Sequence, residues 1–306
     1  MYTVNKYKLI LAAVSGLLLI ACGKTSVSVD ERTYEPKIVI NAYIYPNRPV
    51  ENIRISRNFA IGQEIDKNKI ALNGAAVILE DVLSGENYSL VYDPEKESFG
   101  YPGSDLLIRY GDTYRLNITA NIDGNPLQAT SVTTVPERGL KIDREKSIYG
   151  DLFYRQTDES GELISPRVNY MQSANAAFFL LSIAALDASE ASFIYENPFG
   201  FRIQDALEGG AKIEDFQYSA RWTRPENQVN GDSVIELTWF QFWFYGRYRL
   251  ILYAGDDNFY HYYNTHGNVQ EPDGNLHEPI FNIDGDGIGV FGSAVTDTIF
   301  LNILKK

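Results

Sequence analysis

The sequence predicts a mainly β protein, in which an N-terminal immunoglobulin-like sandwich is followed by a larger antiparallel β domain with one short helix. Short runs of alternating apolar and polar residues recur along the chain, and Gly, Pro, Asn and Asp separate them. The length of 306 residues is typical of about two domains. A hydrophobic content of 44% and a charged content of 22% are those of a globular protein, which excludes wholesale disorder.

Residues 1–21 are predicted to be a lipoprotein signal peptide. Lys6 and Lys8 give a positive start, and the apolar run that follows is shorter than the roughly 20 residues of a membrane-spanning helix. The run ends in Leu-Ile-Ala-Cys, which resembles a bacterial lipobox, and Cys22 is the only thiol of the chain. We expect cleavage before Cys22 and its lipidation, which would anchor the protein in a membrane. The alternative is an ordinary secretory signal that happens to precede a cysteine.

The expected location is the outer membrane. Gly23 follows the cysteine, in place of the Asp that commonly retains enterobacterial lipoproteins in the inner membrane. The leaflet stays open between the cell surface and the periplasmic face. Residues 22–33 are polar and lack a periodic apolar face, so they are expected to form a tether between the lipid and the folded chain.

The immunoglobulin-like sandwich is expected over residues 34–136. Its short strands are predicted at residues 37–45, 52–56, 75–82, 88–92, 98–101, 114–122 and 127–135. Asp123 and Gly124 mark a tight hairpin turn between the last two strands. The Cys-Trp-Cys core of antibody domains is absent, so hydrophobic packing alone is expected to hold this domain together.

A β-rich C-terminal domain is expected over residues 140–306, after a Pro-Glu-Arg-Gly sequence that ends the first pattern. Residues 176–186 are strongly apolar and are interpreted as a strand. Residues 233–245 give the strongest strand signal, and residues 247–253 are expected to pair with them in a central hairpin across Gly246.

One helix is predicted near residue 260. Asp256 is its expected N-cap, Phe259 and Tyr262 lie on its aromatic face, and Gly267 is its expected end. His261 and His266 are five residues apart on this helix, so they do not share a face as a zinc-binding pair would.

Residues 238–245 supply the candidate ligand or partner contacts. In a strand, one face would carry the core residues Phe240, Phe242 and Phe244. The other face would carry four candidate contact residues, namely Trp239, Gln241, Trp243 and Tyr245. That face is compatible with a platform that stacks on sugar rings, with the inner wall of a second layer, or with a protein contact surface. Packing is favoured, because buried aromatic residues outnumber exposed platforms.

No metal, cofactor or catalytic residue is expected. Residues 282–287, which include Asp284 and Asp286, resemble the start of a calcium loop, but Ser293 stands at the twelfth position, where such a loop needs a bidentate Glu. We therefore expect a structural turn that Phe291 anchors in the core. The sequence has no Gly-x-Ser-x-Gly elbow, P-loop or dinucleotide fingerprint, and its one cysteine excludes an internal disulfide and a four-cysteine zinc site.

The net charge of the chain limits the classes of molecule that it is expected to bind. The 40 acidic residues outnumber the 27 basic ones, which gives a formal net charge of −13. Since nucleic-acid binding needs a basic surface that neutralises phosphates, nucleic acid is not expected as a partner.

Several motifs resemble those of a Bacteroidota outer-membrane lipoprotein family of unknown function, often encoded beside TonB-dependent receptors. They are Tyr-Glu-Pro-Lys at residues 34–37, GDTYRLNITA at 111–120, TTVPE at 133–137, YRLILYAGDDNFYHYY at 248–263 and FNIDGDGIGVFGSAV at 281–295. The last motif is the most specific, although this chain has extra spacing before its phenylalanine.

The resemblance implies a cell-envelope location and an accessory role in uptake, and it carries over no catalytic residues. We therefore expect a non-enzymatic accessory of a TonB-dependent outer-membrane uptake system. Its protein partner would be the transporter, and a lipid on Cys22 would attach it to the membrane. The alternative is a surface carbohydrate-binding module that holds glycans on the aromatic strand face.

Overall fold

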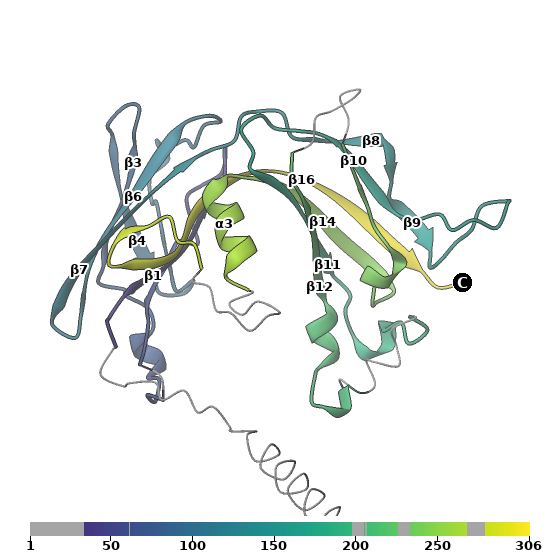
Figure 1. The fold of residues 1–306 in the computed structure, drawn as a ribbon, viewed down its shortest axis with the longest axis horizontal. Helices are drawn as coiled ribbons and strands as arrows, with labels where there is room; N and C mark the ends of the chain where they lie inside the picture. The colour runs from purple at the N-terminus through teal and green to yellow at the C-terminus, as the bar shows by residue number, and fades with distance from the viewer. Residues whose placement is uncertain (1–33, 61, 198–204, 206, 226–232, 268–278) are drawn as a thin grey trace, which may run out of the picture. The chain divides into compact units, whose positions relative to one another are not determined.

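The computed structural model describes residues 34–60, 62–197, 205, 207–225, 233–267 and 279–306. These residues form a mainly β fold with three sheets and one short α-helix (Figure 1), as the sequence predicts. Residues 36–59 and 64–306 belong to one compact unit. The boundary expected at residues 136–140 falls between two consecutive strands of this unit.

A six-stranded sheet contains most of the strands predicted for the N-terminal half. Its order is β15-β7-β6-β3-β4-β5. The strands are β3 (Ala76–Asp81), β4 (Asn87–Asp93), β5 (Ser98–Gly100), β6 (Thr113–Ile122), β7 (Asn125–Thr134) and β15 (Asp284–Gly285). Asp123 and Gly124 join β6 to β7 with φ angles of 53° and 88°, the backbone of the predicted tight turn.

A seven-stranded sheet combines strands from both ends of the chain. Its order is β12-β11-β14-β16-β1-β2, and β9 also pairs with β16. The strands are β1 (Ile38–Ile44), β2 (Arg54–Arg57), β9 (Gly150–Phe153), β11 (Phe178–Ala185), β12 (Tyr218–Thr223), β14 (Gly246–Gly255) and β16 (Gly287–Leu304). The first part of β16 runs parallel to β1, and its last part pairs antiparallel with β14. The predicted strand over residues 176–186 is confirmed as β11.

The third sheet has three strands in the order β13-β10-β8. They are β8 (Lys141–Ile148), β10 (Arg167–Met171) and β13 (Ser233–Glu236).

One face of β16 contributes to two hydrophobic cores. Phe291 packs with Ile40 and residues of the six-stranded sheet, and its side chain is 1% exposed. Further along the same face, Ile299 and Leu301 pack with residues of β10, β11 and β14. Since side chains alternate along a strand, the other face of β16 is directed away from both cores.

The helix α3 (Asp257–Thr265) lies on that other face, against β16 and β14 (Figure 1). Its predicted N-cap is confirmed, because the carboxylate of Asp256 accepts a 3.1 Å hydrogen bond from the backbone N–H of Phe259. The Phe259 ring packs edge-on against Tyr43 and Phe178. The helix ends at Thr265, two residues before the predicted Gly267.

The predicted strand over residues 233–245 is wrong beyond Glu236, and so is the hairpin with residues 247–253. The chain forms a turn of 3-10 helix at Trp239–Gln241, and β14 pairs with β11 and β16. The physical reason is that the segment carries large rings at nearly every position. A strand would direct half of them away from the core, whereas the turn lets Trp239, Phe242 and Phe244 all be buried.

Candidate functional site

The four candidate contact residues of the aromatic segment do not share one exposed face. Trp239 is only 4% exposed, and its indole N–H donates a 3.1 Å hydrogen bond to the backbone oxygen of Ile164. The side-chain oxygen of Gln241 accepts a 2.9 Å hydrogen bond from the backbone N–H of Thr238, so it caps the turn. Both residues therefore have structural partners.

The other two candidates are half-buried. The Trp243 ring stacks on Phe193 at 6.2 Å and also contacts Phe216. Tyr245 lies beside Tyr154, and the ammonium group of Lys305 is 5.8 Å from the centre of the Tyr245 ring. A platform for sugar rings needs an open ring face, and Trp239 and Trp243 place theirs against other side chains.

Two further predictions fall on different parts of the chain. Cys22, the predicted lipidation site, lies outside the described residues. Asp286 is described, and its carboxylate accepts a 3.1 Å hydrogen bond from the backbone N–H of Gln128, so it has a structural partner on β7. Within the described ranges, no group of three or more His, Cys, Asp or Glu residues is placed to hold a metal ion.

The described part of the chain contains no helix that is both long and apolar enough to cross a membrane.

An exposed surface forms where β12, β11, β14 and β16 lie side by side. The strand register aligns Tyr218, Ala184, Arg249 and Phe300 across the four strands. The next row across the sheet is Ala220, Ser182, Ile251 and Thr298. Paired residues point to the same face of a sheet, so both rows lie on the face that carries α3.

The helix borders only one end of this surface. Tyr260 packs against Trp222 at 6.0 Å, and Phe259 packs against Tyr253 at 6.2 Å. We name the part beyond the helix the open sheet face, which consists of Tyr218, Ala220, Arg249, Ile251, Thr298 and Phe300.

Large rings on the open sheet face are accessible. Tyr218 is 66% exposed and Phe300 is 57% exposed, while Trp222 at its border is 39% exposed. Single exposed rings are ordinary, but here two stand in one row of the sheet, Tyr218 on β12 and Phe300 on β16, with Arg249 on β14 between them. Such a row forms a surface suited to contact with another molecule. Tyr, Trp and Arg are also the residues that most often dominate the energy of protein interfaces.

The charge of this surface is opposite to that of the whole chain. Arg249 is exposed and, among the described residues, has no carboxylate within ion-pair distance. Its neighbour Arg247 is held by Asp187 at 2.7 Å, and the hydrogen bonds from Arg247 lower the pKa of Asp187 to about 2. As far as the described residues go, Arg249 therefore gives the open sheet face an uncompensated cation.

A second guanidinium lies near the same surface. Arg48 donates a 2.8 Å hydrogen bond to the hydroxyl of Thr296 and lies over the Tyr45 ring at 5.4 Å. Burial raises the pKa of Tyr253, while the charges of Arg249 and Arg48 act in the opposite direction. Both cations are therefore close enough to act on one phenol, which makes the region suited to carboxylates.

The sequence offered only a weak signal for this surface. Arg247 and Arg249 alternate with apolar residues along β14, which is the pattern of a strand with one solvated face. Tyr218 and Trp222 belong to residues 196–233, which are rich in Gly, Pro, Asn and charged residues, and no strand was predicted at either ring. Their alignment with Phe300 depends on strand pairing over long distances in sequence.

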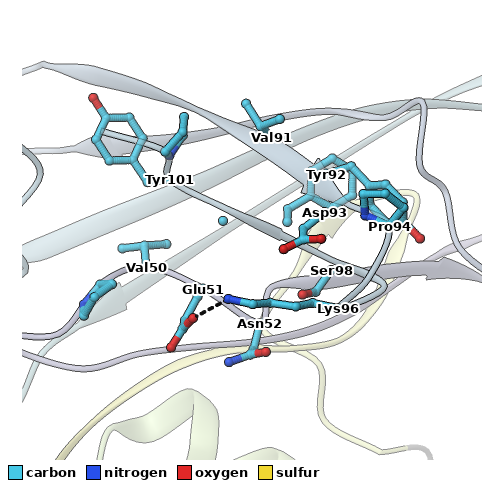
Figure 2. Close-up of a pocket in the computed structure, with 14 residues that line it drawn as sticks. Val50, Glu51, Asn52, Val91, Tyr92, Asp93, Pro94, Lys96, Ser98 and Tyr101 are labelled. Carbon is cyan, nitrogen blue, oxygen red and sulfur yellow. Dashed lines mark hydrogen bonds and ion pairs between the residues drawn. The ribbon is translucent and has the colours of Figure 1, made fainter. Parts of the chain in front are cut away.

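A separate hollow of about 380 Å³ lies beside β4 and β5 (Figure 2). Figure 2 shows the ion pair between Lys96 and Glu51 within it, with an N–O distance of 3.0 Å. Both side chains are about half exposed, at 53% and 49%, so the pair adds little to stability. Its lining carries two acids, Glu51 and Asp93, and one cation, Lys96, which is already paired with Glu51. This hollow is therefore a weaker candidate for a partner than the open sheet face.

A family model described as a domain of unknown function (DUF4249) matches residues 24–299. A search of the curated proteins finds no match.

Three solved structures of adhesins are similar to this chain at a low level. A tetra-tandem repeat from the extending region of a large adhesion protein is 11% identical, with a TM-score of 0.22, and the match covers 88% of this chain and 49% of that one. A bacterial ice-binding adhesin of 1.5 MDa is 11% identical, with a TM-score of 0.20 and coverages of 89% and 65%. A calcium-stabilised adhesin of an Antarctic bacterium is 12% identical, with a TM-score of 0.19 and coverages of 88% and 49%. This chain thus spans less than two thirds of each, and the scores are too low to indicate a common fold.

Proposed function

This chain belongs to the DUF4249 family of domains of unknown function, and we propose that it is a lipid-anchored outer-membrane protein that serves as a non-enzymatic accessory of a TonB-dependent uptake system. Its lipid is attached at Cys22, and its partner is the transporter. The sequence supports the anchor through the lipobox-like ending of residues 1–21 and the single cysteine that follows.

The observation that carries the docking role is the open sheet face. It combines exposed rings, Tyr218 and Phe300, with the uncompensated cation of Arg249 on rigid strands. A partner that covers the rings and offers a carboxylate to Arg249 would gain apolar burial and a charge-assisted hydrogen bond. The partner surface is therefore expected to be acidic and partly apolar.

Strand positions suit such a role better than loop positions. The backbone of β14 is paired on both sides, with β11 and with β16, so Arg249 sits in the interior of the sheet. Its position is fixed before a partner arrives, and little conformational entropy of the backbone is lost on docking.

The carbohydrate-binding alternative loses its original support. It relied on Trp239 and Trp243 as stacking rings, and these rings pack within the protein. A glycan on the open sheet face would need contacts other than those that motivated the alternative.

The test is affinity purification of the tagged chain from detergent-solubilised envelope. Wild type is compared with an Arg249→Glu, Phe300→Ala variant and with a control variant, Arg54→Glu, Val91→Ala, altered at exposed positions of β2 and β4. Wild type and control should retain a TonB-dependent transporter in stoichiometric amount, and the first variant should lose it. Recovery of wild type alone at both low and moderate salt would contradict the proposal.

A further inference from the structure

The outer edge of β12 is unpaired in the part of the chain that the structure describes. β12 is an end strand of the seven-stranded sheet and pairs on one side with β11. On its other side, no described residue makes a backbone hydrogen bond with it. The opposite end of the same sheet differs, because the backbone N–H of Arg57 on β2 donates a 3.1 Å hydrogen bond to the oxygen of Ile70.

The register shows which backbone groups face this free edge. The backbone N–H of Ala185 donates a 3.0 Å hydrogen bond to the oxygen of Gln217, and this pair continues the register of β11 with β12. In an antiparallel ladder, pairs that exchange hydrogen bonds alternate with pairs that do not. The N–H and C=O groups of Tyr218, Ala220 and Trp222 therefore point away from β11. They form a row with which a further strand can pair.

β12 lacks the features by which edge strands usually avoid such pairing. Its sequence, YSARWT, contains no Pro and no Lys, and its register with β11 runs without a bulge over residues 218–223. All of its residues are exposed or half-buried. Since edge strands are commonly protected by Pro, by Lys or by a bulge, the edge of β12 is a template for a strand from another molecule.

The sequence of β12 is complementary to itself. In an antiparallel pair of two β12 strands centred on Ala220, the small side chains of Ala220 meet at the twofold axis. Tyr218 of each copy then lies opposite Trp222 of the other, and such aromatic pairs stabilise antiparallel sheets. On the other face, Ser219 lies opposite Arg221, so like charges do not face each other directly.

The charges at the two ends of β12 are also complementary in this arrangement. Glu214 and Asp215 shortly precede the strand, whereas Arg221 and Arg224 lie at its end, and all four side chains are exposed. An antiparallel neighbour brings the acidic start of one strand beside the basic end of the other. The attraction operates at both ends of the pair, because a twofold axis repeats every contact. A second copy of this chain therefore fits the edge in shape, hydrogen bonding and charge.

We propose that this chain forms a twofold dimer through antiparallel pairing of β12 with β12 of a second copy. The two seven-stranded sheets become one continuous sheet across the axis. Because residues that face each other in an antiparallel pair point to the same side, the open sheet faces of both copies lie on one side of the joined sheet. The dimer goes beyond the proposed function, since its formation needs no transporter.

The test is thiol crosslinking of the full chain in envelope membranes. Ala220→Cys places the thiols on facing residues whose Cα atoms are about 5.5 Å apart, a distance suited to the short thiol-to-thiol reagent dibromobimane. Tyr218→Cys places them four positions apart along the paired strands, roughly 14 Å, and is the matched control. Crosslinking is scored above that of wild type, whose one cysteine is Cys22. Ala220→Cys should give a crosslinked dimer, and Tyr218→Cys should not.

A proline variant tests the hydrogen bonds between the copies. Ala220→Pro removes an N–H that makes no bond to β11, so each chain should still fold and keep its far-ultraviolet circular dichroism. Ala220→Thr keeps that N–H and is the control. Light scattering of the full chains in detergent should give twice the mass of one chain for wild type and Ala220→Thr. Ala220→Pro should give the mass of one chain.

The proposal is overturned if Ala220→Cys gives no crosslinked dimer, if Tyr218→Cys crosslinks equally well, or if a folded Ala220→Pro variant keeps the mass of a dimer. The crosslinking result stands whether or not the proline variant folds. None of these measurements involves the transporter, so their failure leaves the docking proposal to its own experiment.

Discussion

The carboxylate of Asp256 accepts a 2.6 Å hydrogen bond from the hydroxyl of Thr133, a residue 123 positions earlier in the chain. The same carboxylate caps α3 and accepts a 3.1 Å hydrogen bond from the backbone N–H of Ser293 on β16. Thr133 belongs to β7, so one side chain links the helix to strands of two sheets. Because Asp256 is only 5% exposed, this link is made away from water.

The first prediction concerns the pH dependence of stability. Burial raises the pKa of Asp256 from 3.8 to about 6, so the folded protein holds this proton more tightly than the unfolded chain. The resulting stability is fully present below pH 3.8 and is lost as the pH rises to about 6. The loss in the free energy of unfolding is up to about 3 kcal/mol.

An Asp256→Asn variant isolates this effect, because Asn can cap the helix but does not ionise in this range. Urea denaturation of wild type and variant should show a difference in stability that changes in favour of the variant between pH 4 and pH 7. A difference that stays constant across this range would show that Asp256 does not titrate there.

The second prediction compares the two faces of β16. Phe291 is 1% exposed, so Phe291→Ala should lower the free energy of unfolding by about 3–5 kcal/mol through lost burial and the cavity left behind. Phe300, on the other face of the same strand, is 57% exposed, and Phe300→Ala should cost less than about 1 kcal/mol. Urea denaturation measures both, and equal losses would mean that the assignment of the faces is wrong.

The third prediction tests the close approach of β1 and β16. Gly289 has a φ angle of 108°, and a Cβ atom there would lie 2.1 Å from the backbone oxygen of Ile40. Gly289→Ala should therefore lower the free energy of unfolding by about 1–3 kcal/mol through the unfavourable φ angle alone. The clash with the Ile40 backbone should lower it further. Gly74→Ala, where a Cβ atom would meet nothing within 4 Å, is the matched control and should have little effect. Similar thermal shifts for both variants would count against the parallel pairing.

Local patterns were enough to predict the strands β3 to β7 and the helix. Strict alternation and the Asp123-Gly124 turn mark β6 and β7, and Asp256 marks the start of α3. The stretch that contains Asp284, Asp286 and Phe291 was expected to be a structural turn, but β16 begins at Gly287. Its glycine-rich first part has the composition of a turn, whereas here Gly289 lets the backbone approach Ile40. Nothing local indicates that the partner is β1.

The candidate surface was harder to predict than the fold. The aromatic segment around Trp239 was interpreted by period alone, and tertiary packing instead favours a turn that buries Trp239 and Phe242 together. Tyr218, Arg249 and Phe300 come from three strands that lie far apart in the sequence. Only the pairing of these strands makes them one surface.

The fourth prediction concerns the anchor. Metabolic labelling with palmitate should mark the wild-type chain, and Cys22→Ser should abolish the label because no other cysteine exists to carry the thioether. An immunoblot of total protein controls for expression. If the Cys22→Ser variant were still labelled, the proposed lipid anchor at Cys22 would be wrong.

The proposed docking is tested most directly by photo-crosslinking in intact cells. A photoreactive amino acid replaces Phe300 on the open sheet face in one strain and Val91, which is 56% exposed on β4, in a second strain. The proposed function predicts one adduct from position 300, with the mass of this chain plus a TonB-dependent outer-membrane transporter, and no such adduct from position 91. A transporter adduct from position 91 alone, or from neither position while the protein is in the outer membrane, would contradict it.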